Sequence, residues 1–181
     1  MNIGFDLDKI FIDYPPLVPD ALINRLYKQE SNGVLSYRMP SKAEKMLRIL
    51  THYPFLRPPI ISNIQFVEHL AKNKKQKLYL ISSRFSFLKD RTENIIKKYN
   101  FEKIFDEMFF NFEDQQPHIF KNEITKKLNI DLYVDDDLQL LEYLSMKNPR
   151  VKFFWLNNKE NKTLERNLFA IKNLSEMFKD F

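Results

Sequence analysis

Residues 2–13, NIGFDLDKIFID, contain an apolar run that ends in two acids spaced by one residue. The run at residues 3–5 is short and apolar, which is typical of a strand at the centre of a parallel sheet. Asp6 and Asp8 follow it directly. Because open α/β sheets place their ligands at the carboxyl ends of the strands, this stretch predicts an α/β fold with both acids at the ligand-binding edge.

Strand-like and helix-like segments alternate along the rest of the chain. The strand-like runs lie at residues 2–6, 78–82, 107–111, 131–135 and 151–156. Helical periodicity covers residues 60–74, 86–99, 118–128, 137–147 and about 160–179. This alternation predicts βαβ units, whose right-handed crossovers give a three-layer, Rossmann-like α/β sandwich around a central parallel five-stranded sheet.

The connection between the first two predicted strands is much longer than a crossover requires. Residues 60–74 can form the crossover helix, which leaves residues 14–59 as an insert. We therefore expect a core made of residues 1–13 and 60–181, with a small helical cap at residues 14–59 inserted after the first strand.

The insert has a helical pattern of its own and prolines in both stems. Helices are expected at residues 19–30 and 41–52. The double prolines are Pro15-Pro16 and Pro58-Pro59. Because proline fixes φ and stops helices, these pairs suit the stalks of a cap, although two ordinary loop turns would use the same residues.

Composition indicates a globular protein with one main core. The chain has 181 residues, 44% of them hydrophobic and 17 of them Phe, which suffices for one domain with a modest insert. No apolar run approaches the roughly 20 residues of a membrane helix, and no basic segment followed by an apolar one indicates a signal peptide. The absence of cysteine excludes disulfides and thiolate metal sites, so we expect a cytoplasmic protein without membrane association.

The net charge of +5 and the pI of about 9.2 raise the question of a nucleic-acid partner. The Lys residues are spread along the chain, and Lys, Asn, Ile and Phe are abundant while Gly falls to 2. A skew of the whole chain favours a compositional origin of the charge. Nucleic-acid binding is therefore the weaker alternative, and the sequence leaves the oligomeric state undefined.

Polar residues follow the predicted strands in a fixed order. The two acids after the first strand come first, and carboxylates so close together need a divalent cation or a shared proton. Ser82 and Arg84 follow the second strand, Lys121 lies on a later helix, and residues 135–137 are three acids after the fourth strand. Each feature alone is common, as a helix cap, a solvated lysine or an acidic turn. Together they bring acids, a hydroxyl and a lysine to one edge of the sheet.

This order resembles the motif order of the haloacid dehalogenase superfamily, which has D-x-D after strand 1, a hydroxyl after strand 2, a lysine, and D-D after strand 4. The resemblance covers residues 2–13 and 60–156. It implies a Mg²⁺-dependent phosphatase in which Asp6 attacks phosphorus and forms an aspartyl-phosphate. Asp8 would protonate the leaving oxygen and then deprotonate the attacking water. Dehalogenating members lack this second acid, so its presence favours phosphoryl transfer.

The resemblance also implies the residues that bind phosphate. Ser82 would hold a phosphoryl oxygen, and Arg84 would either assist it or pair with an acid. Lys121 would offset the negative charge around the nucleophile. The sequence departs from the family pattern at Lys9, where Gly is usual, and at Ile10, where Thr or Val is common.

The implied metal ligands are oxygens. Mg²⁺ prefers six oxygen ligands and retains waters, so two carboxylates and a carbonyl suffice. Asp6, the backbone carbonyl of Asp8, and Asp136 are the expected ligands. Asp135 is the alternative to Asp136 if the alignment of the motif is shifted by one residue.

The insert suggests the substrate class. Its position resembles that of the cap in deoxyribonucleotidases, so the expected partner is a small phosphorylated substrate such as a nucleotide. Side chains expected to set specificity are Arg25, Tyr37, Arg38 and Arg57. The histidines, His52, His69 and His118, lack metal-ligand spacing and are expected to be neutral and structural. A catalytically idle binding or scaffold domain and a phosphatase of nucleic-acid ends are the competing hypotheses.

Overall fold

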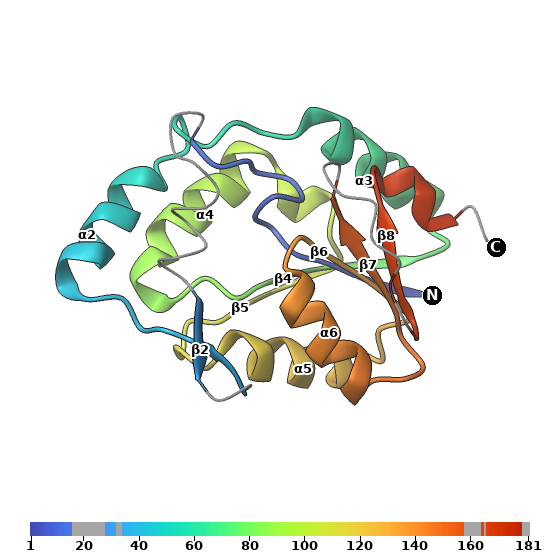
Figure 1. Cartoon of the computed structure of the whole chain (residues 1–181). Coiled ribbons are helices and arrows are strands. Elements are labelled where there is room, and N and C mark those ends of the chain that lie inside the picture. The colour runs from blue at the N-terminus through green and yellow to red at the C-terminus, as the bar shows by residue number, and fades with distance from the viewer. Residues whose placement is uncertain (16–27, 32–33, 158–163, 165, 179–181) are drawn as a thin grey trace.

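A sheet of six parallel strands forms the centre of the molecule (Figure 1). The computed structural model describes residues 1–15, 28–31, 34–157, 164 and 166–178. The strands, in spatial order, are β5 (Glu107–Phe110), β4 (Lys77–Ser82), β1 (Asn2–Phe5), β6 (Leu132–Asp135), β7 (Lys152–Leu156) and β8 (Leu168–Ile171). The apolar strand β1 lies between β4 and β6, with parallel pairing on both sides. The prediction of a Rossmann-like parallel sheet is confirmed.

Helices cover both faces of the sheet and complete the three predicted layers (Figure 1). The helices on one face are α3 (Ile61–Asn73) and α4 (Lys89–Lys98), and those on the other are α5 (Pro117–Lys127) and α6 (Leu138–Lys147). The α3 and α4 layer packs on Phe5, Leu80 and Val134. The opposite layer packs on Ile81 and Tyr133. Neighbouring strand residues therefore face opposite layers, as the two-residue period of a strand requires.

Gly4 allows β1 and β6 to approach closely. A Cβ atom at this position would lie 2.6 Å from Cδ2 of Tyr133, whose ring is completely buried. Any side chain at Gly4 would have to displace that ring. One of the two glycines of the chain is thus explained by packing at the central strand.

The helix predicted at residues 160–179 is wrong in the part that the structure describes, where β8 and a 3₁₀ helix (Leu174–Phe178) stand instead. The sheet consequently has six strands rather than five. The buried residues of this region, Leu168, Ile171, Leu174 and Met177, are three apart. That spacing imitates one face of a helix, although the first two residues are the buried ends of a short strand.

The insert combines a hairpin with a helix. Strands β2 (Lys28–Ser31) and β3 (Val34–Tyr37) are antiparallel, and α2 (Lys42–Thr51) confirms the helix predicted at residues 41–52. Ser41 and Glu44 form a capping box that begins α2. The helix predicted at residues 19–30 lies mostly outside the described residues, and residues 28–30 belong to β2.

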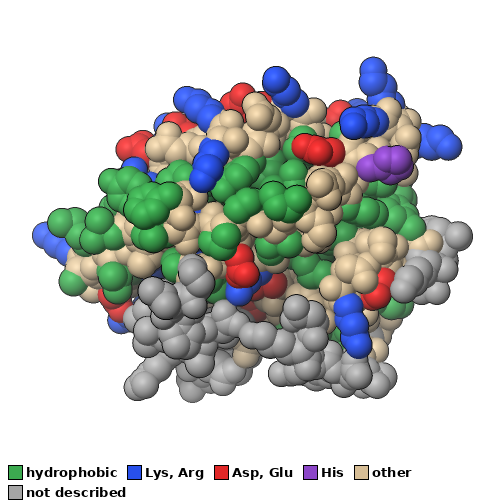
Figure 2. Space-filling view, turned by 90° about the horizontal axis from the view of Figure 1, so that it is seen from above, with side chains coloured by type: hydrophobic (Ala, Val, Ile, Leu, Met, Phe, Trp, Pro, Cys, Tyr) green, Lys and Arg blue, Asp and Glu red, His purple; other side chains and the backbone are tan. Residues whose placement is uncertain are grey.

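The surface of the insert carries exposed apolar side chains. Figure 2 shows hydrophobic side chains gathered on the face seen from above. On and after α2, the exposed large hydrophobic residues are Met46, Leu47, Leu50 and Phe55. Arg48 of the same helix is instead turned inward and buried. Among the described residues, no helix is long and apolar enough to cross a bilayer.

Candidate active site

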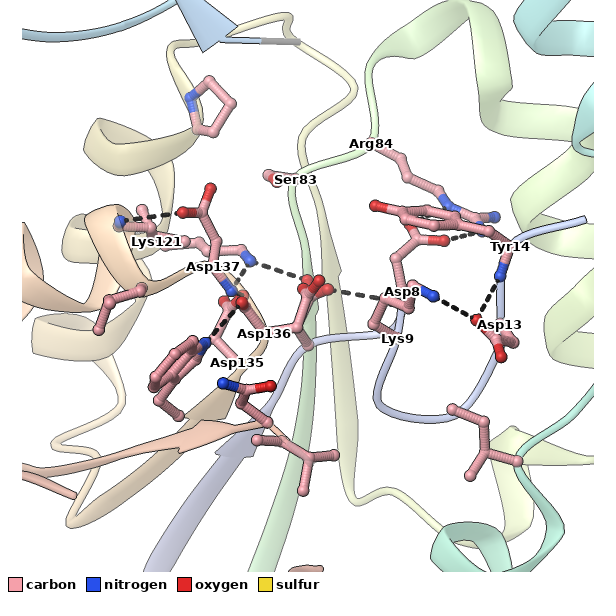
Figure 3. A pocket seen from close by; sticks show the side chains of 18 of the residues that line it. Asp8, Lys9, Asp13, Tyr14, Ser83, Arg84, Lys121, Asp135, Asp136 and Asp137 are labelled. Atoms are coloured by element: carbon pink, nitrogen blue, oxygen red, sulfur yellow. Dashed lines mark hydrogen bonds and ion pairs between the residues drawn. The ribbon is translucent and has the colours of Figure 1, made fainter. Parts of the chain in front are cut away.

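The carboxyl ends of β1, β4 and β6 meet at one cavity of about 820 Å³ (Figure 3). The chain leaves β1 for β4 on one side and later enters β6 on the other, so the strand order reverses at this point. Open α/β sheets bind ligands where the order reverses. Residues from all three strand ends line the cavity, among them Asp6, Asp8, Ser83, Arg84 and Asp136, and Lys121 of α5 lines it as well.

Lys121 joins two of the strand ends. Its ammonium donates to Asp6 Oδ1 at 2.8 Å and to Asp135 Oδ2 at 2.6 Å, and all three side chains are buried. Burial raises the pKa of Asp6 to about 7; Lys121 opposes that shift and Asp135 adds to it. Burial alone would lower the pKa of Lys121, but Asp135 and Asp6 raise it well above its ordinary value. Lys121 is therefore a permanent cation at the base of the cavity.

Three acids at this edge form a group that could hold a cation. One oxygen each of Asp6, Asp135 and Asp136 lies within 4.8 Å of the others. Burial raises the pKa of Asp136 well above its ordinary value, and the neighbouring carboxylates of Asp135 and Asp6 add to this shift. With all three carboxylates ionised, as ligands of a cation must be, this group and the ammonium of Lys121 carry a net formal charge of −2. An all-oxygen site with this charge fits Mg²⁺.

The hydrogen bonds distinguish Asp136 from Asp135. Asp135 Oδ2 accepts from Lys121, and Asp135 Oδ1 accepts from the backbone N–H of Asp137 at 3.1 Å. The Asp136 carboxylate accepts no hydrogen bond from the described residues, while its backbone carbonyl accepts from Trp155 Nε1 at 2.9 Å. Trp155 thus fixes the backbone of Asp136 and leaves its carboxylate available to a cation.

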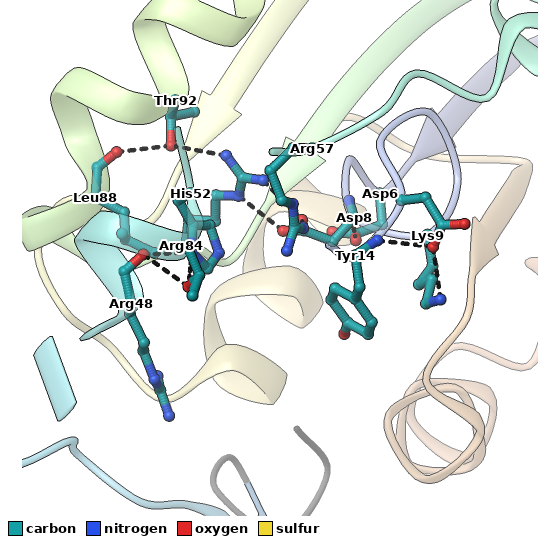
Figure 4. A network of polar contacts seen from close by, with 12 residues as sticks. Asp6, Asp8, Lys9, Tyr14, Arg48, His52, Arg57, Arg84, Leu88 and Thr92 are labelled. Carbon is teal, nitrogen blue, oxygen red and sulfur yellow. Dashed lines mark hydrogen bonds and ion pairs between the residues drawn. The ribbon is translucent and has the colours of Figure 1, made fainter. Parts of the chain in front are cut away.

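Two buried arginines hold the Asp8 carboxylate (Figure 4). Arg84 Nε donates to Oδ2 and Arg84 Nη2 donates to Oδ1, both at 2.7 Å, and Arg57 Nη2 also donates to Oδ1. The Arg57 and Arg84 side chains are 2% and 4% exposed, and that of Asp8 is 20% exposed. Burial alone would raise the pKa of Asp8, but the Arg84 and Arg57 guanidiniums hold it far below its ordinary value. Asp8 is therefore a carboxylate.

Solved structures share this arrangement of strands and helices. A protein from Thermotoga maritima, named as a β-phosphoglucomutase, aligns with a TM-score of 0.61 at 17% identity, over 94% of this chain and 94% of its own. A haloacid dehalogenase-like hydrolase from Xanthomonas campestris aligns with a TM-score of 0.59 at 10% identity, over 95% and 90% of the two chains. The chain has the haloacid dehalogenase-like fold.

Two further structures have the same fold. An enzyme of this family from Bacteroides thetaiotaomicron, an aspartate-to-alanine mutant in complex with magnesium and inorganic phosphate, aligns with a TM-score of 0.53 at 12% identity, over 90% and 96% of the chains. Part of a Pnkp1/Rnl/Hen1 RNA repair complex aligns with a TM-score of 0.53 at 16% identity, over 86% of this chain and 42% of that one. No family model matches the sequence, and no curated protein matches it.

Within the haloacid dehalogenase-like fold, the serine predicted to bind phosphate is one residue out of place. Ser82 is 1% exposed and does not line the cavity, whereas Ser83 does (Figure 3). Ser82 lies two residues after Leu80 in β4, so both side chains point to the same face of the sheet. Leu80 packs on that face against the α3 and α4 layer. Since strand residues alternate between faces, the serine that reaches the cavity is the next one.

Lys9 stands in a backbone conformation that favours glycine. Its φ is 60°, in the left-handed region, which explains why the family usually has Gly here. The Lys9 ammonium donates to Asp13 Oδ1 at 2.6 Å and lies 4.4 Å from the centre of the Tyr14 ring. The side chain therefore turns toward the start of the insert, where it lines the cavity with Tyr14.

Part of the insert is fastened to the core beside the acids. Tyr37 Oη donates to Asp137 Oδ2 at 2.8 Å, and the Tyr37 backbone exchanges two hydrogen bonds with the Gln116 side chain. Of the residues predicted to set specificity, Tyr37 and Arg38 line the cavity and Arg57 binds Asp8. Arg25 lies outside the described residues.

Two of the three histidines are buried in contacts with the protein, and His52 also lines the cavity. His52 Nδ1 lies 2.7 Å from the backbone carbonyl of Arg48, and burial, together with two nearby arginines, lowers the pKa of His52 well below its ordinary value. Burial also lowers the pKa of His118, which stacks on Tyr37. His69 is exposed on α3. Sequence reasoning missed Gln116, Arg48 and Tyr14, because no pattern in the sequence connects residues so far apart to one cavity.

Proposed function

We propose that the protein is a Mg²⁺-dependent phosphatase that hydrolyses a phosphate monoester of a small molecule through an aspartyl-phosphate on Asp6. The observation that carries the proposal is the buried contact of Lys121 with Asp6, beside the acids Asp135 and Asp136, at the carboxyl edge of the sheet. A carboxylate nucleophile, a counter-charge and a hard-cation site are the groups that this chemistry requires.

The reaction divides into two displacements at phosphorus. In the first, an Asp6 oxygen bonds to phosphorus, the ester P–O bond breaks, and the leaving oxygen takes the proton of the substrate monoanion by way of Asp8, whose resting form is the carboxylate. In the second, a water oxygen bonds to phosphorus, the bond to Asp6 breaks, and Asp8 takes the proton of the water. Asp8 passes that proton to the departing inorganic phosphate, and both acids return to their starting states.

The remaining groups bind and balance charge. Lys121 stabilises the negative charge that gathers around Asp6, and the Ser83 hydroxyl donates to a phosphoryl oxygen. Asp6, Asp136 and the backbone carbonyl of Asp8 would hold Mg²⁺, which offsets the charge of the phosphoryl group when bound. The Bacteroides thetaiotaomicron structure of the same fold contains magnesium and inorganic phosphate, which supports Mg²⁺ as the cation of this proposal.

The substrate is proposed to be a small molecule, a nucleotide among the candidates. A cavity of about 820 Å³ falls within the range of small-molecule sites. Tyr14, Tyr37 and Trp155 supply aromatic surface in that cavity, and Arg38 supplies positive charge. These side chains suit a substrate with a planar ring and an anionic group.

The test is a phosphatase screen of the whole chain with and without Mg²⁺. Turnover of small phosphate esters that EDTA abolishes and Mg²⁺ restores supports the proposal. Absence of turnover, with intact Mg²⁺ and phosphate binding, would favour an idle binding domain. Preferential release of phosphate from oligonucleotide ends, with strongly salt-dependent binding, would favour a nucleic-acid-end phosphatase.

A further inference from the structure

Asp8 lies where three segments of the chain meet. Arg57 reaches it from the C-terminal stem of the insert, and Arg84 reaches it from the loop after β4 (Figure 4). Two backbone hydrogen bonds of 2.8 Å fasten the stem to the loop after β1, between residues 11–13 and residues 58–60. The stem of the insert and the side chain of Asp8 therefore form one connected unit.

The hydrogen bonds leave a single acceptor position on the Asp8 carboxylate. Oδ1 accepts from both Arg57 and Arg84, and Oδ2 accepts only from Arg84 Nε. A carboxylate has about four lone-pair sites, two on each oxygen. In the described part of the chain no other donor bonds Oδ2. Its second lone pair is therefore the position at which Asp8 can take a proton without displacing a hydrogen bond from either arginine.

The two arginines differ in their access to a substrate. Arg84 lines the cavity, whereas Arg57 does not and is 1% exposed. Arg57 thus reaches the reacting groups through Asp8, and its guanidinium also lies 4.8 Å from the centre of the Tyr14 ring. Because a guanidinium donates in a fixed plane, two of them on one carboxylate fix both its rotation and the oxygen that it presents to the cavity.

We propose that Arg57 and Arg84 are positioning residues that orient Asp8 as the base of the second displacement, so that Oδ2 takes the proton of the attacking water. This inference rests on the proposed function. In that step the water oxygen bonds to phosphorus, the bond between phosphorus and Asp6 breaks, and the proton of the water moves to Asp8 Oδ2. Loss of either guanidinium lets the carboxylate rotate and slows this step.

The test uses p-nitrophenyl phosphate, whose leaving group needs no protonation, so we expect the second displacement to limit turnover. Arg57→Gln is expected to lower kcat about tenfold and KM in proportion, so that kcat/KM is unchanged, and acid-quenched mass spectrometry should show phosphoenzyme accumulating. In the Asp8→Asn background the same substitution should have no further effect, because coupled residues are not additive. Arg57→Lys keeps the charge and should restore part of kcat, which covers the case in which Arg57→Gln fails to fold.

The matched control is Arg91→Gln. Arg91 bonds the backbone carbonyl of Ile49 in α2 and lies 3.7 Å from the centre of the Tyr53 ring, so it contacts the insert without touching Asp8. It should leave kcat and the phosphoenzyme fraction unchanged. Unchanged kcat in both Arg57 variants, or an equal loss in the Asp8→Asn background, would overturn the positioning role alone. A wild-type protein that hydrolyses no ester would overturn the proposed function as well.

Discussion

The Lys121 ammonium lies 2.8 Å from Asp6 Oδ1 and 2.6 Å from Asp135 Oδ2, so one buried cation joins the ends of β1 and β6. Lys121 lies on helix α5, and its side chain is 3% exposed. A buried charge is tolerated only with partners of opposite sign, and here the partners exceed it in number. The excess of negative charge is what makes the site suited to a divalent cation.

Removal of this cation should cost both stability and turnover. Lys121→Met leaves Asp6 and Asp135 buried without their counter-charge, and breaking a buried pair in this way destabilises a protein by about 3–5 kcal/mol. We expect that loss in urea unfolding of the metal-free protein, together with loss of essentially all phosphatase activity. Lys126→Met changes an exposed lysine of the same helix and should move neither measurement by much. Equal stability of the two variants would contradict the assigned role of Lys121.

Stabilisation by Mg²⁺ should increase with pH. The pKa of Asp6 is raised from an ordinary 3.8 to about 7, so between these values the folded, metal-free protein binds a proton that the unfolded chain does not. The free energy of unfolding contributed by Asp6 therefore falls as pH rises through this window. Mg²⁺ competes with that proton, so its binding strengthens over the same range.

The measurement is the Tm with 5 mM Mg²⁺ minus the Tm with EDTA, taken at pH 5.5 and again at pH 8. If Mg²⁺ binds with micromolar affinity, 5 mM is roughly a thousandfold excess over Kd. The difference should be several degrees larger at pH 8. Comparison with the EDTA sample at the same pH cancels the contribution of the histidines. Asp136→Asn should abolish the Mg²⁺ effect at both values, and a pH-independent effect in the wild type would remove the metal assignment.

Asp8 and Asp6 should have separable kinetic roles. Asp6→Asn should abolish turnover, since an amide cannot form the acyl phosphate. Asp8→Asn keeps the nucleophile and should lower kcat by about 10²- to 10⁴-fold, most strongly for esters with poor leaving groups. Acid-quenched mass spectrometry should show one added phosphoryl group on Asp8→Asn and none on Asp6→Asn. Equal activity of wild type and Asp8→Asn on an alkyl phosphate would end the acid–base assignment.

The strands and the order of the acids could be predicted because each leaves a local signal in the sequence. Apolar runs such as residues 78–82 mark buried parallel strands. Because the strands are parallel, the residues that follow them lie at the carboxyl edge of the sheet, whichever contacts their side chains make. The position of β8 could not be predicted in this way, because apolar residues three apart fit a helix as well as a short strand followed by a 3₁₀ turn.

The contacts of Asp8 lay beyond sequence reasoning for a different reason. Its partners Arg57 and Arg84 are 49 and 76 residues away, and their pairing depends on how the stem of the insert closes on the loop after β1. Arg57 was expected to be a specificity residue of the cap and Arg84 to bind phosphate or an acid. Only the folded backbone shows that both guanidiniums face the same carboxylate.

Replacement of Lys9 should report the cost of its left-handed backbone. A non-glycine residue with φ near +60° costs about 1–2 kcal/mol, whereas a partly exposed ion pair such as that of Lys9 with Asp13 contributes about 0–1 kcal/mol. Lys9→Gly removes both, and Lys9→Ala removes only the ion pair. We expect Lys9→Gly to be more stable than Lys9→Ala by about 1 kcal/mol in urea unfolding. The reverse order would show that this backbone is not strained.

The two adjacent serines after β4 should behave differently, although they are the same residue type in neighbouring positions. Ser83 lines the cavity, and a hydrogen bond to a charged group contributes about 1.5–3 kcal/mol, so Ser83→Ala should lower kcat/KM by roughly 10- to 100-fold. Ser82 Oγ is buried without a hydrogen-bond partner among the described residues. Since removal of such a hydroxyl relieves an unsatisfied polar group, Ser82→Ala should keep full activity and equal or greater stability. Steady-state kinetics and urea unfolding of the two variants give the answer, and a larger kinetic loss in Ser82→Ala would return the phosphate-binding role to Ser82.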